Sequence, residues 1–235
     1  MGRLVEMKKI VSFGDSFIFG TELENNRYGD KAWPGLIAKE LDCDYQTEAV
    51  PGCGNDYIAR QIYSYFSENA AENTLAVINW TWASRWDFYI VKHETWITLG
   101  PNCVPEQLQS LIDKTESHRV VEFYNDYANS SILWNKFRNL QTIYAVQKFL
   151  DDKGVNNIQT YIDYLLFDQQ WHAPDYVKEL QRLVQPEMQL FDDKNFLDWS
   201  KEKQFNITDH WHPLEEAHRA AADYWKEIYK HALKI

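Results

Sequence analysis

Ser16 is the first residue whose position suggests chemistry, because it lies where a turn interrupts an apolar run. In the stretch VSFGDSFIFG, Gly14 and Asp15 break a hydrophobic segment that resumes after Ser16. Serine is among the best helix N-caps, and it is also a nucleophile when an adjacent base takes its proton. The turn by itself leaves both interpretations of Ser16 open.

A second group of chemically capable side chains lies near the C-terminus, in the stretch DHWHP. Asp209 and His212 are three residues apart, with His210 between them. An imidazole oriented by a carboxylate is a general base, and the same residue types also bind zinc. The group is therefore either the base that Ser16 needs or part of a metal site, although no further ligand clusters with it in the sequence.

The elements that must position these residues alternate between strands and helices. Short apolar runs predict strands at 8–13, 45–50, 75–80 and 158–166, with a shorter one near 188–191. Helical spacing predicts helices at 31–41, 56–67 and 126–150 and a last one that starts at Pro213. Residues 91–125 show no clean period and are expected to form an irregular insertion. No repeat or linker separates two cores, so residues 1–235 are expected to form one domain.

Alternating strands and helices predict a three-layer α/β/α fold with a doubly wound, mostly parallel, flavodoxin-like sheet of about five strands. Ligands of such sheets bind at the carboxyl ends of the strands. At least three of four unusual polar stretches directly follow a predicted strand, and we expect all four at one edge of the sheet. They are Gly14–Ser16, Gly52–Asp56, Thr81–Arg85 and Asp209–Pro213.

Together these stretches resemble the SGNH hydrolases, the GDSL-type esterase and lipase superfamily. The resemblance covers nearly the whole chain in motif order, and its specificity lies in FGDSFIFG and DHWHP. It implies that Ser16 is the nucleophile, that His212 is the base and that Asp209 orients His212. Such a triad works through an acyl-enzyme intermediate.

The same resemblance implies an oxyanion hole that includes the backbone N–H groups of Ser16 and Gly54. The third family block departs from its pattern, because Ala83 or Ser84 stands where an asparagine donor is expected. Losing one such donor costs about 2.7–4 kcal/mol of transition-state stabilisation. The candidate replacement donors are Asn55, Thr81, Ser84 and Arg85.

Aromatic residues make up 15% of the chain, with ten tryptophans, and they suit flat, sugar-like or acyl ligands. We expect Asp15, Trp82 and Trp86 beside the substrate, although Asp15 also suits a turn-stabilising role. The expected reaction is hydrolysis of short acyl esters, such as acetyl esters, perhaps on a carbohydrate. The altered third block favours one alternative, a catalytically weak relative that binds a carbohydrate or acyl ligand. A metal-dependent hydrolase using Asp209, His210 and His212 is the other.

Charge and composition exclude several partners. A net charge of −11 argues against nucleic acid and against an anionic membrane surface, since both need clustered Lys and Arg. No apolar run approaches the ~20 residues of a membrane span, and the N-terminus shows no signal peptide. Three cysteines without metal-site spacing predict reduced thiols and a cytoplasmic location. Separately, we expect no metal and no cofactor. Oligomeric state is not predicted.

Overall fold

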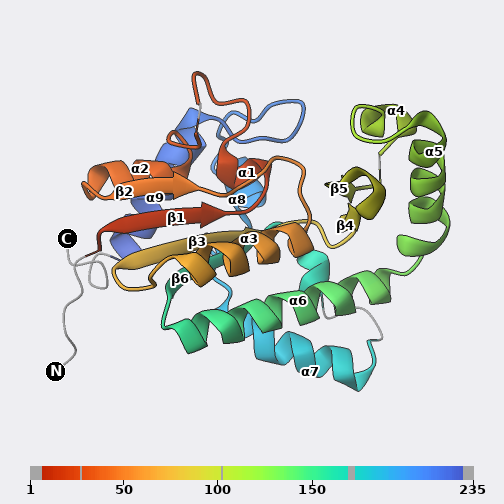
Figure 1. Cartoon of the computed structure of the whole chain (residues 1–235). Coiled ribbons are helices and arrows are strands. Elements are labelled where there is room, and N and C mark those ends of the chain that lie inside the picture. The colour runs from red at the N-terminus through yellow and green to blue at the C-terminus, as the bar shows by residue number, and fades with distance from the viewer. Residues whose placement is uncertain (1–6, 27, 102, 169–172, 230–235) are drawn as a thin grey trace.

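The computed structural model describes residues 7–26, 28–101, 103–168 and 173–229, and a parallel sheet lies at its centre (Figure 1). In the described residues this sheet has the strand order β2-β1-β3-β6. Its strands are β1 (Lys9–Phe13), β2 (Asp44–Thr47), β3 (Thr74–Trp80) and β6 (Asn156–Tyr161). All three strand pairings are parallel, as the alternation of elements predicts.

Helices cover both faces of the sheet (Figure 1). One face carries α3 (Asn55–Glu68), α6 (Ile132–Lys153) and α7 (Asp175–Val184). The other carries α1 (Ser16–Phe19), α2 (Trp33–Glu40), α8 (Phe196–Glu202) and α9 (Glu215–Tyr229). The three-layer, doubly wound α/β/α prediction is confirmed.

Alternation along the central strands explains why both faces are buried. In β1, Val11 and Phe13 face the α3 side, whereas Ile10 faces the α2 side. In β3 every residue is buried, so apolar side chains from Leu75 to Ile78 follow one another instead of alternating with polar ones.

The fifth predicted strand, near 188–191, is reduced to a single parallel bridge between Met188 and Gln159. The Gln189 N–H also donates to the Gln159 carbonyl at 2.7 Å. Asp192 and Asp193 then turn the chain away with left-handed φ values of 47° and 64°, which ends the extended segment.

Other element boundaries differ from prediction because of local caps. The helix expected at 126–150 begins at Ile132, since the Ser131 hydroxyl accepts from the Trp134 N–H, and it ends at the left-handed Gly154. The strand expected at 158–166 ends at Tyr161, followed by a short 3₁₀ turn, Tyr164–Leu166. The last helix is assigned from Glu215, two residues after Pro213.

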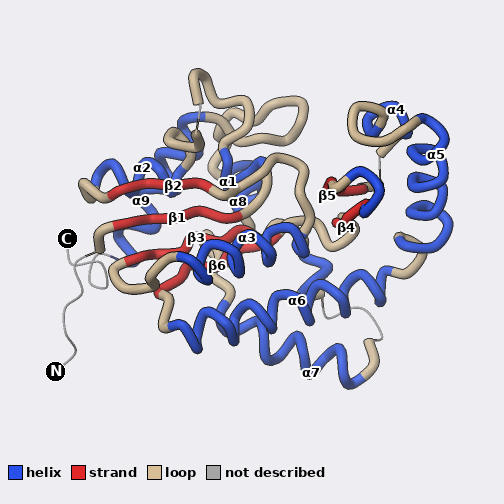
Figure 2. The backbone as a smooth tube through the Cα atoms, viewed as in Figure 1, coloured by secondary structure: helices blue, strands red, loops and turns tan. Residues whose placement is uncertain are grey.

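Residues 91–125 are not irregular, which corrects the sequence-based expectation. The strands β4 (Trp86–Ile90) and β5 (Thr95–Leu99) form an antiparallel hairpin joined by a 3₁₀ turn, Val91–His93. Helices α4 (Pro105–Leu108) and α5 (Lys114–Phe123) and a π-turn, Tyr124–Ala128, follow it. Their buried side chains form a separate small hydrophobic cluster that includes Ile97, Leu99 and Tyr124. Figures 1 and 2 show this unit beyond the end of the sheet to which the strand arrows of Figure 1 point.

Short 3₁₀ and bridge segments connect the last helices of the chain. A 3₁₀ turn at Gln185–Glu187 follows α7, and Phe191 pairs with Lys194 before α8. Among the described helices, none combines the length and the apolar character that crossing a bilayer requires.

Candidate active site

The turn after β1 presents Ser16 as a reactive side chain rather than as a cap. Asp15 is the N-cap of α1, because its Oδ1 accepts from the Phe17 N–H at 3.1 Å. Gly14 has a left-handed φ of 154°, and a Cβ there would lie 2.9 Å from the Asn79 carbonyl oxygen. Within the described residues, neither the Ser16 hydroxyl nor its N–H has a hydrogen-bond partner. The capping interpretation of Ser16 is therefore wrong.

Ser16 opens into a pocket of about 330 Å³ that also contains the predicted base. The pocket collects side chains from the turn after β1, the segment after β3, α8 and the loop before α9. They are Ser16, Phe17, Trp82, Arg85, Leu197, His210, Trp211 and His212. Four of the predicted site residues, Ser16, Trp82, Arg85 and His212, thus meet at the carboxyl edge of the sheet.

The His212 imidazole is held by a carboxylate that sequence reasoning missed. Its Nδ1 lies 2.6 Å from Oε2 of Glu22, and the Thr208 hydroxyl donates to the same oxygen at 2.6 Å. Phe17 contacts the ring edge-on, with 5.6 Å between the ring centroids. Hydrogen bonds from Thr208 and His212 hold the pKa of Glu22 below its usual range. Since Nδ1 is engaged, Nε2 is the nitrogen left to exchange a proton.

The expected pair of Asp209 and His212 is not formed. Asp209 and His210 are the two central residues of a turn closed by the Trp211 N–H, which donates to the Thr208 carbonyl at 2.9 Å. Central turn residues point outward, and both side chains are exposed. His210 nevertheless reaches the rim of the Ser16 pocket.

The metal alternative gains no support from this turn. Among the described residues, the group of metal-ligating side chains that comes together is His93, Asp113 and Glu116, not the C-terminal histidines. There the Lys92 ammonium already contacts Asp113 at 3.2 Å and Glu116 at 3.1 Å.

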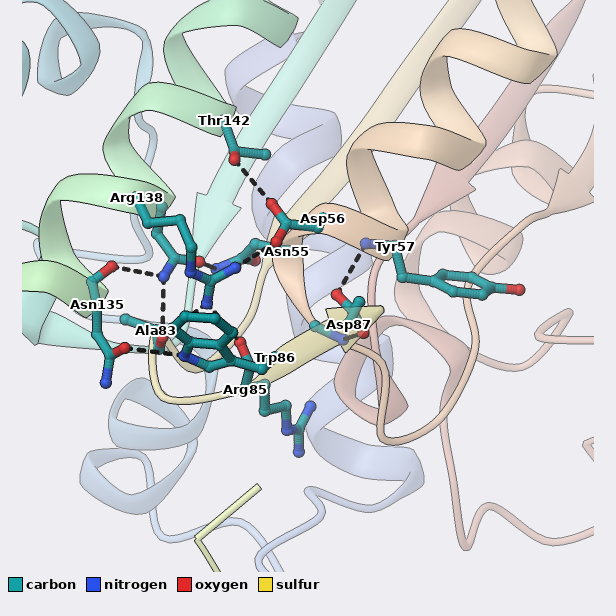
Figure 3. Close-up of polar contacts among 12 residues, drawn as sticks. Asn55, Asp56, Tyr57, Ala83, Arg85, Trp86, Asp87, Asn135, Arg138 and Thr142 are labelled. Atoms are coloured by element: carbon teal, nitrogen blue, oxygen red, sulfur yellow. Dashed lines mark hydrogen bonds and ion pairs between the residues drawn. The ribbon is translucent and has the colours of Figure 1, made fainter. Parts of the chain in front are cut away.

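The prediction that the Gly54 N–H is an oxyanion donor is also wrong, because this N–H is hydrogen-bonded within the protein. It donates to Oδ1 of Asp87 at 2.9 Å, and a Cβ at Gly54 would lie 2.4 Å from Oδ2 of Asp87. The Tyr57 N–H donates to Oδ2 at 2.8 Å, as Figure 3 shows, and the Thr98 hydroxyl also donates to this carboxylate. Burial raises the pKa of Asp87, although these donors oppose the shift. The Asp87 carboxylate, on strand β4 of the hairpin, thus occupies the Gly54 N–H that was expected to bind the substrate oxyanion.

Asn55 and Thr81 are buried and satisfied within the fold. The Asn55 amide donates to the Thr81 carbonyl at 3.1 Å and to Asn139 at 2.6 Å, and it accepts from the Thr81 N–H at 2.7 Å. The Thr81 hydroxyl donates to Asp15 at 2.6 Å. Neither residue lines the Ser16 pocket, so the structure does not support either as an oxyanion donor.

Arg85 is the replacement donor that does reach the pocket. Its Nη1 donates to Asp15 at 2.9 Å, to the Cys53 carbonyl at 3.0 Å and to the Thr81 hydroxyl at 2.7 Å. All side-chain hydrogen bonds found for Arg85 in the described residues use this one nitrogen, while its carbonyl accepts from Arg138 at 2.7 Å. Figure 3 shows the side chain extending away from the network around Arg138.

Asp15, predicted beside the substrate, is instead an internal anchor. It is wholly buried, and its carboxylate holds Arg85, Thr81 and the Phe17 N–H. The turn-stabilising role expected for Asp15 is confirmed.

The two predicted tryptophans separate. Trp82 is 36% exposed and lines the Ser16 pocket. Trp86 does not: its Nε1 donates to Asn135 at 3.0 Å and the Arg138 guanidinium stacks 4.5 Å from its ring (Figure 3). Trp86 is therefore half-buried against α6 and lines neither this pocket nor the one beside it.

A second pocket, of about 460 Å³, shares Trp82 and Arg85 with the first. Its other walls come from the segment after β3, the hairpin and the loop after it. They are Ser84, Thr98, Gly100, Pro101, Cys103 and Gln107. Ser84 belongs to this pocket rather than to that of Ser16, and its carbonyl accepts from the Tyr124 hydroxyl at 2.8 Å.

The chain is similar to known proteins in its structure but not detectably in its sequence. No protein-family model and no curated protein matches the sequence. A lipolytic G-D-S-L family protein from Veillonella parvula matches at a TM-score of 0.51 and 12% identity, covering 95% of this chain and 98% of that one. The psychrotrophic esterase EstA from Pseudoalteromonas sp. matches at 0.52 and 12%, covering 97% and 100%. TesA matches at 0.52 and 14%, covering 95% and 99%.

The chain has the fold of these three solved structures. The prediction drawn from the two sequence blocks is thereby confirmed for the architecture. At 12–14% identity the likeness concerns the fold, so the chemistry rests on the residues of this chain.

Proposed function

We propose that the protein is a serine esterase in which Ser16 attacks a short acyl ester and His212 is the general base. The observation that carries the proposal is the shared pocket. It contains the Ser16 hydroxyl, which does not cap the helix that follows it. It also contains the His212 imidazole, whose Nδ1 is hydrogen-bonded to a carboxylate. These are the roles that triad chemistry requires.

The reaction follows from this arrangement. The Nε2 of His212 takes the Ser16 proton as Oγ attacks the ester carbonyl, and the resulting imidazolium is stabilised by the carboxylate at Nδ1. The imidazolium then returns the proton to the leaving alcohol, which leaves an acyl group on Ser16. A water molecule, activated by the same imidazole, releases the acid and restores the serine.

The developing oxyanion needs donors, and Gly54 and a third-block asparagine do not supply them. We assign this role to the Ser16 N–H and the Arg85 guanidinium. The two N–H groups of Arg85 Nη1 are shared among three internal acceptors, which fixes the guanidinium and preorganises its remaining N–H groups. A charged donor forms a shorter and stronger bond to an oxyanion than a neutral amide does.

The pocket dimensions favour a small acyl group on a polar carrier. Phe17 and Leu197 give the Ser16 pocket apolar walls, and its volume of about 330 Å³ is at the low end for ligand sites. The adjoining pocket offers room for the alcohol, with Trp82 as a flat surface and polar groups from Thr98 and Gln107. A sugar hydroxyl ester fits this combination.

One observation favours a second candidate, a weakly catalytic binding protein. Two donor positions of the expected oxyanion hole are occupied or substituted, because Gly54 is bound to Asp87 and no asparagine follows β3. If Arg85 does not compensate, ligand binding would persist without efficient turnover.

Fluorophosphonate labelling tests the proposal directly. We expect stoichiometric modification of the wild-type protein, located at Ser16 by peptide mass spectrometry, together with hydrolysis of nitrophenyl acetate. Ser16→Ala should lose both while retaining its circular dichroism spectrum. Folded wild-type protein that neither reacts with the probe nor turns over the ester would favour the binding protein instead.

A further inference from the structure

We propose that Glu22, rather than Asp209, is the residue that positions His212, and that Thr208 fixes Glu22 for this role. The inference rests on the proposed function, since it concerns the same base. It moves the third member of the triad from the turn that carries His212 to the loop after α1.

The contacts around one oxygen atom carry this assignment. Oε2 of Glu22 receives hydrogen bonds from His212 Nδ1 and from the Thr208 hydroxyl, each at 2.6 Å. The Thr208 hydroxyl also accepts from the His212 N–H at 3.2 Å, so it connects the base and the acid. The Thr208 N–H donates to the His212 carbonyl at 3.0 Å, which closes the loop around both residues.

The loop that carries Glu22 is braced, which distinguishes this contact from an ordinary surface ion pair. Glu22 has a left-handed φ of 69°, a conformation that side-chain-bearing residues rarely adopt. Leu23 is buried beside it, and the Glu24 N–H donates to Glu215 at 2.8 Å, at the start of α9. Asn26 donates to the carbonyls of Phe19 and Gly20 at 2.7 and 2.8 Å. Strain maintained by such support is typical of functional sites.

Contact with the imidazole, rather than burial, distinguishes Glu22 from Asp209. Both acidic residues are exposed, but the Glu22 carboxylate lies 2.6 Å from Nδ1 of His212, whose side chain is only 15% exposed. The extra methylene of glutamate lets a carboxylate from a loop 190 positions away in sequence reach Nδ1. Its charge fixes the Nδ1–H tautomer and stabilises the imidazolium that forms when Ser16 is deprotonated.

Other titratable groups near His212 do not replace Glu22. His210 and Arg85 line the same pocket, and both would oppose rather than favour an imidazolium when charged. His218 lies below on α9, where burial lowers its pKa to about 3, so it is neutral at working pH. Its Nδ1 accepts from the Trp33 N–H at 3.1 Å. Among the described residues, Glu22 is the carboxylate in contact with His212.

Three single variants separate the assignments by nitrophenyl acetate kinetics. Glu22→Gln keeps the shape but removes the charge, and we expect kcat/KM to fall about 10²–10⁴-fold, as for acids of other triads. Asp209→Asn should change it by less than about threefold, because exposed polar substitutions are nearly neutral. Glu24→Gln is the matched control, an exposed glutamate of the same loop whose carboxylate makes no hydrogen bond or ion pair among the described residues. A large loss in Asp209→Asn with little effect in Glu22→Gln would overturn the proposal.

The pH profile gives a readout that a purely structural role would not move. Removing the negative charge makes the imidazolium less favourable, so the acid limb of kcat/KM should shift to lower pH in Glu22→Gln. Glu22→Asp, which retains the charge but shortens the side chain, should recover part of the activity. An unshifted acid limb in Glu22→Gln would show that Glu22 is not coupled to His212.

Failure of this inference can be distinguished from failure of the proposed function. Ser16→Ala decides whether the protein is a serine esterase, and the position of Glu22 is measured separately by proton NMR. The Nδ1 proton of His212 should give a hydrogen-bonded, low-field signal in wild type, Ser16→Ala and Asp209→Asn that disappears in Glu22→Gln. Thr208→Val should weaken the signal, since the carboxylate loses its second donor. A signal that persists in Glu22→Gln would refute the pairing whatever the activity.

Discussion

Arg85→Lys should separate the catalytic role of Arg85 from its structural one. In the structure Nη1 of Arg85 satisfies three acceptors, Asp15, the Cys53 carbonyl and the Thr81 hydroxyl, at 2.7–3.0 Å. A lysine ammonium has three donors, enough for these acceptors, but it has no second nitrogen for the pocket. The variant therefore preserves the internal contacts and removes the proposed oxyanion donor.

The expected size of the effect follows from the bond that is lost. Removing one preorganised oxyanion donor costs about 2.7–4 kcal/mol, or about 10²–10³ in kcat. Because the interaction forms mainly in the transition state, KM should change little. Arg85→Met should additionally destabilise the fold, since it leaves the wholly buried Asp15 without its cation. Breaking a buried pair costs about 3–5 kcal/mol, and the 19% exposure of Arg85 places the expected loss at the lower end.

Two measurements decide the outcome. Saturation kinetics with nitrophenyl acetate give kcat and KM, and urea denaturation gives the free energy of unfolding for each variant. We expect the free energy of unfolding of Arg85→Lys to stay within about 1 kcal/mol of wild type, while kcat falls about 10²–10³-fold. A stable Arg85→Lys protein with unchanged kcat would refute Arg85 as the oxyanion donor.

Three further outcomes follow from the same structure. A chain-length series of nitrophenyl esters should show kcat/KM falling steeply beyond about C4–C6, because the pocket is small; a maximum at long chains would contradict the substrate proposal. Gly54→Ala should lower the free energy of unfolding by about 1–3 kcal/mol, since its Cβ would collide with the Asp87 carboxylate, and an unchanged urea midpoint would count against that contact. The pKa of His218 is lowered from 6.5 to about 3 by burial, so the unfolded state binds the proton first as pH falls. Its contribution to stability is thus present above pH 6.5 and is lost towards pH 3, by about 1.4 kcal/mol per unit, and this slope should be reduced in His218→Gln.

Much of the fold could be predicted from the sequence, because it depends on local patterns. The apolar runs at β1 and β3 and the helical spacing of α6 report burial directly, and alternation of strands with helices specifies a parallel sheet. The position of the reactive serine could also be predicted from the sequence, since Gly14 and Asp15 indicate a turn after a buried strand. The hairpin of β4 and β5 was missed because its burial does not alternate cleanly along β4, where Asp87 is a buried charge.

The partners of the reactive groups were decided by the tertiary structure. Asp209 matches the D-x-x-H spacing, yet the turn that contains it directs its side chain outward, and the loop after α1 delivers Glu22 instead. The Gly54 N–H is taken by Asp87, which lies 33 positions away on the hairpin. Sequence spacing reports which residues share a turn, a strand or a helix face. It does not report which loops meet, because hydrogen bonds between distant loops depend on the packing of the elements that carry them.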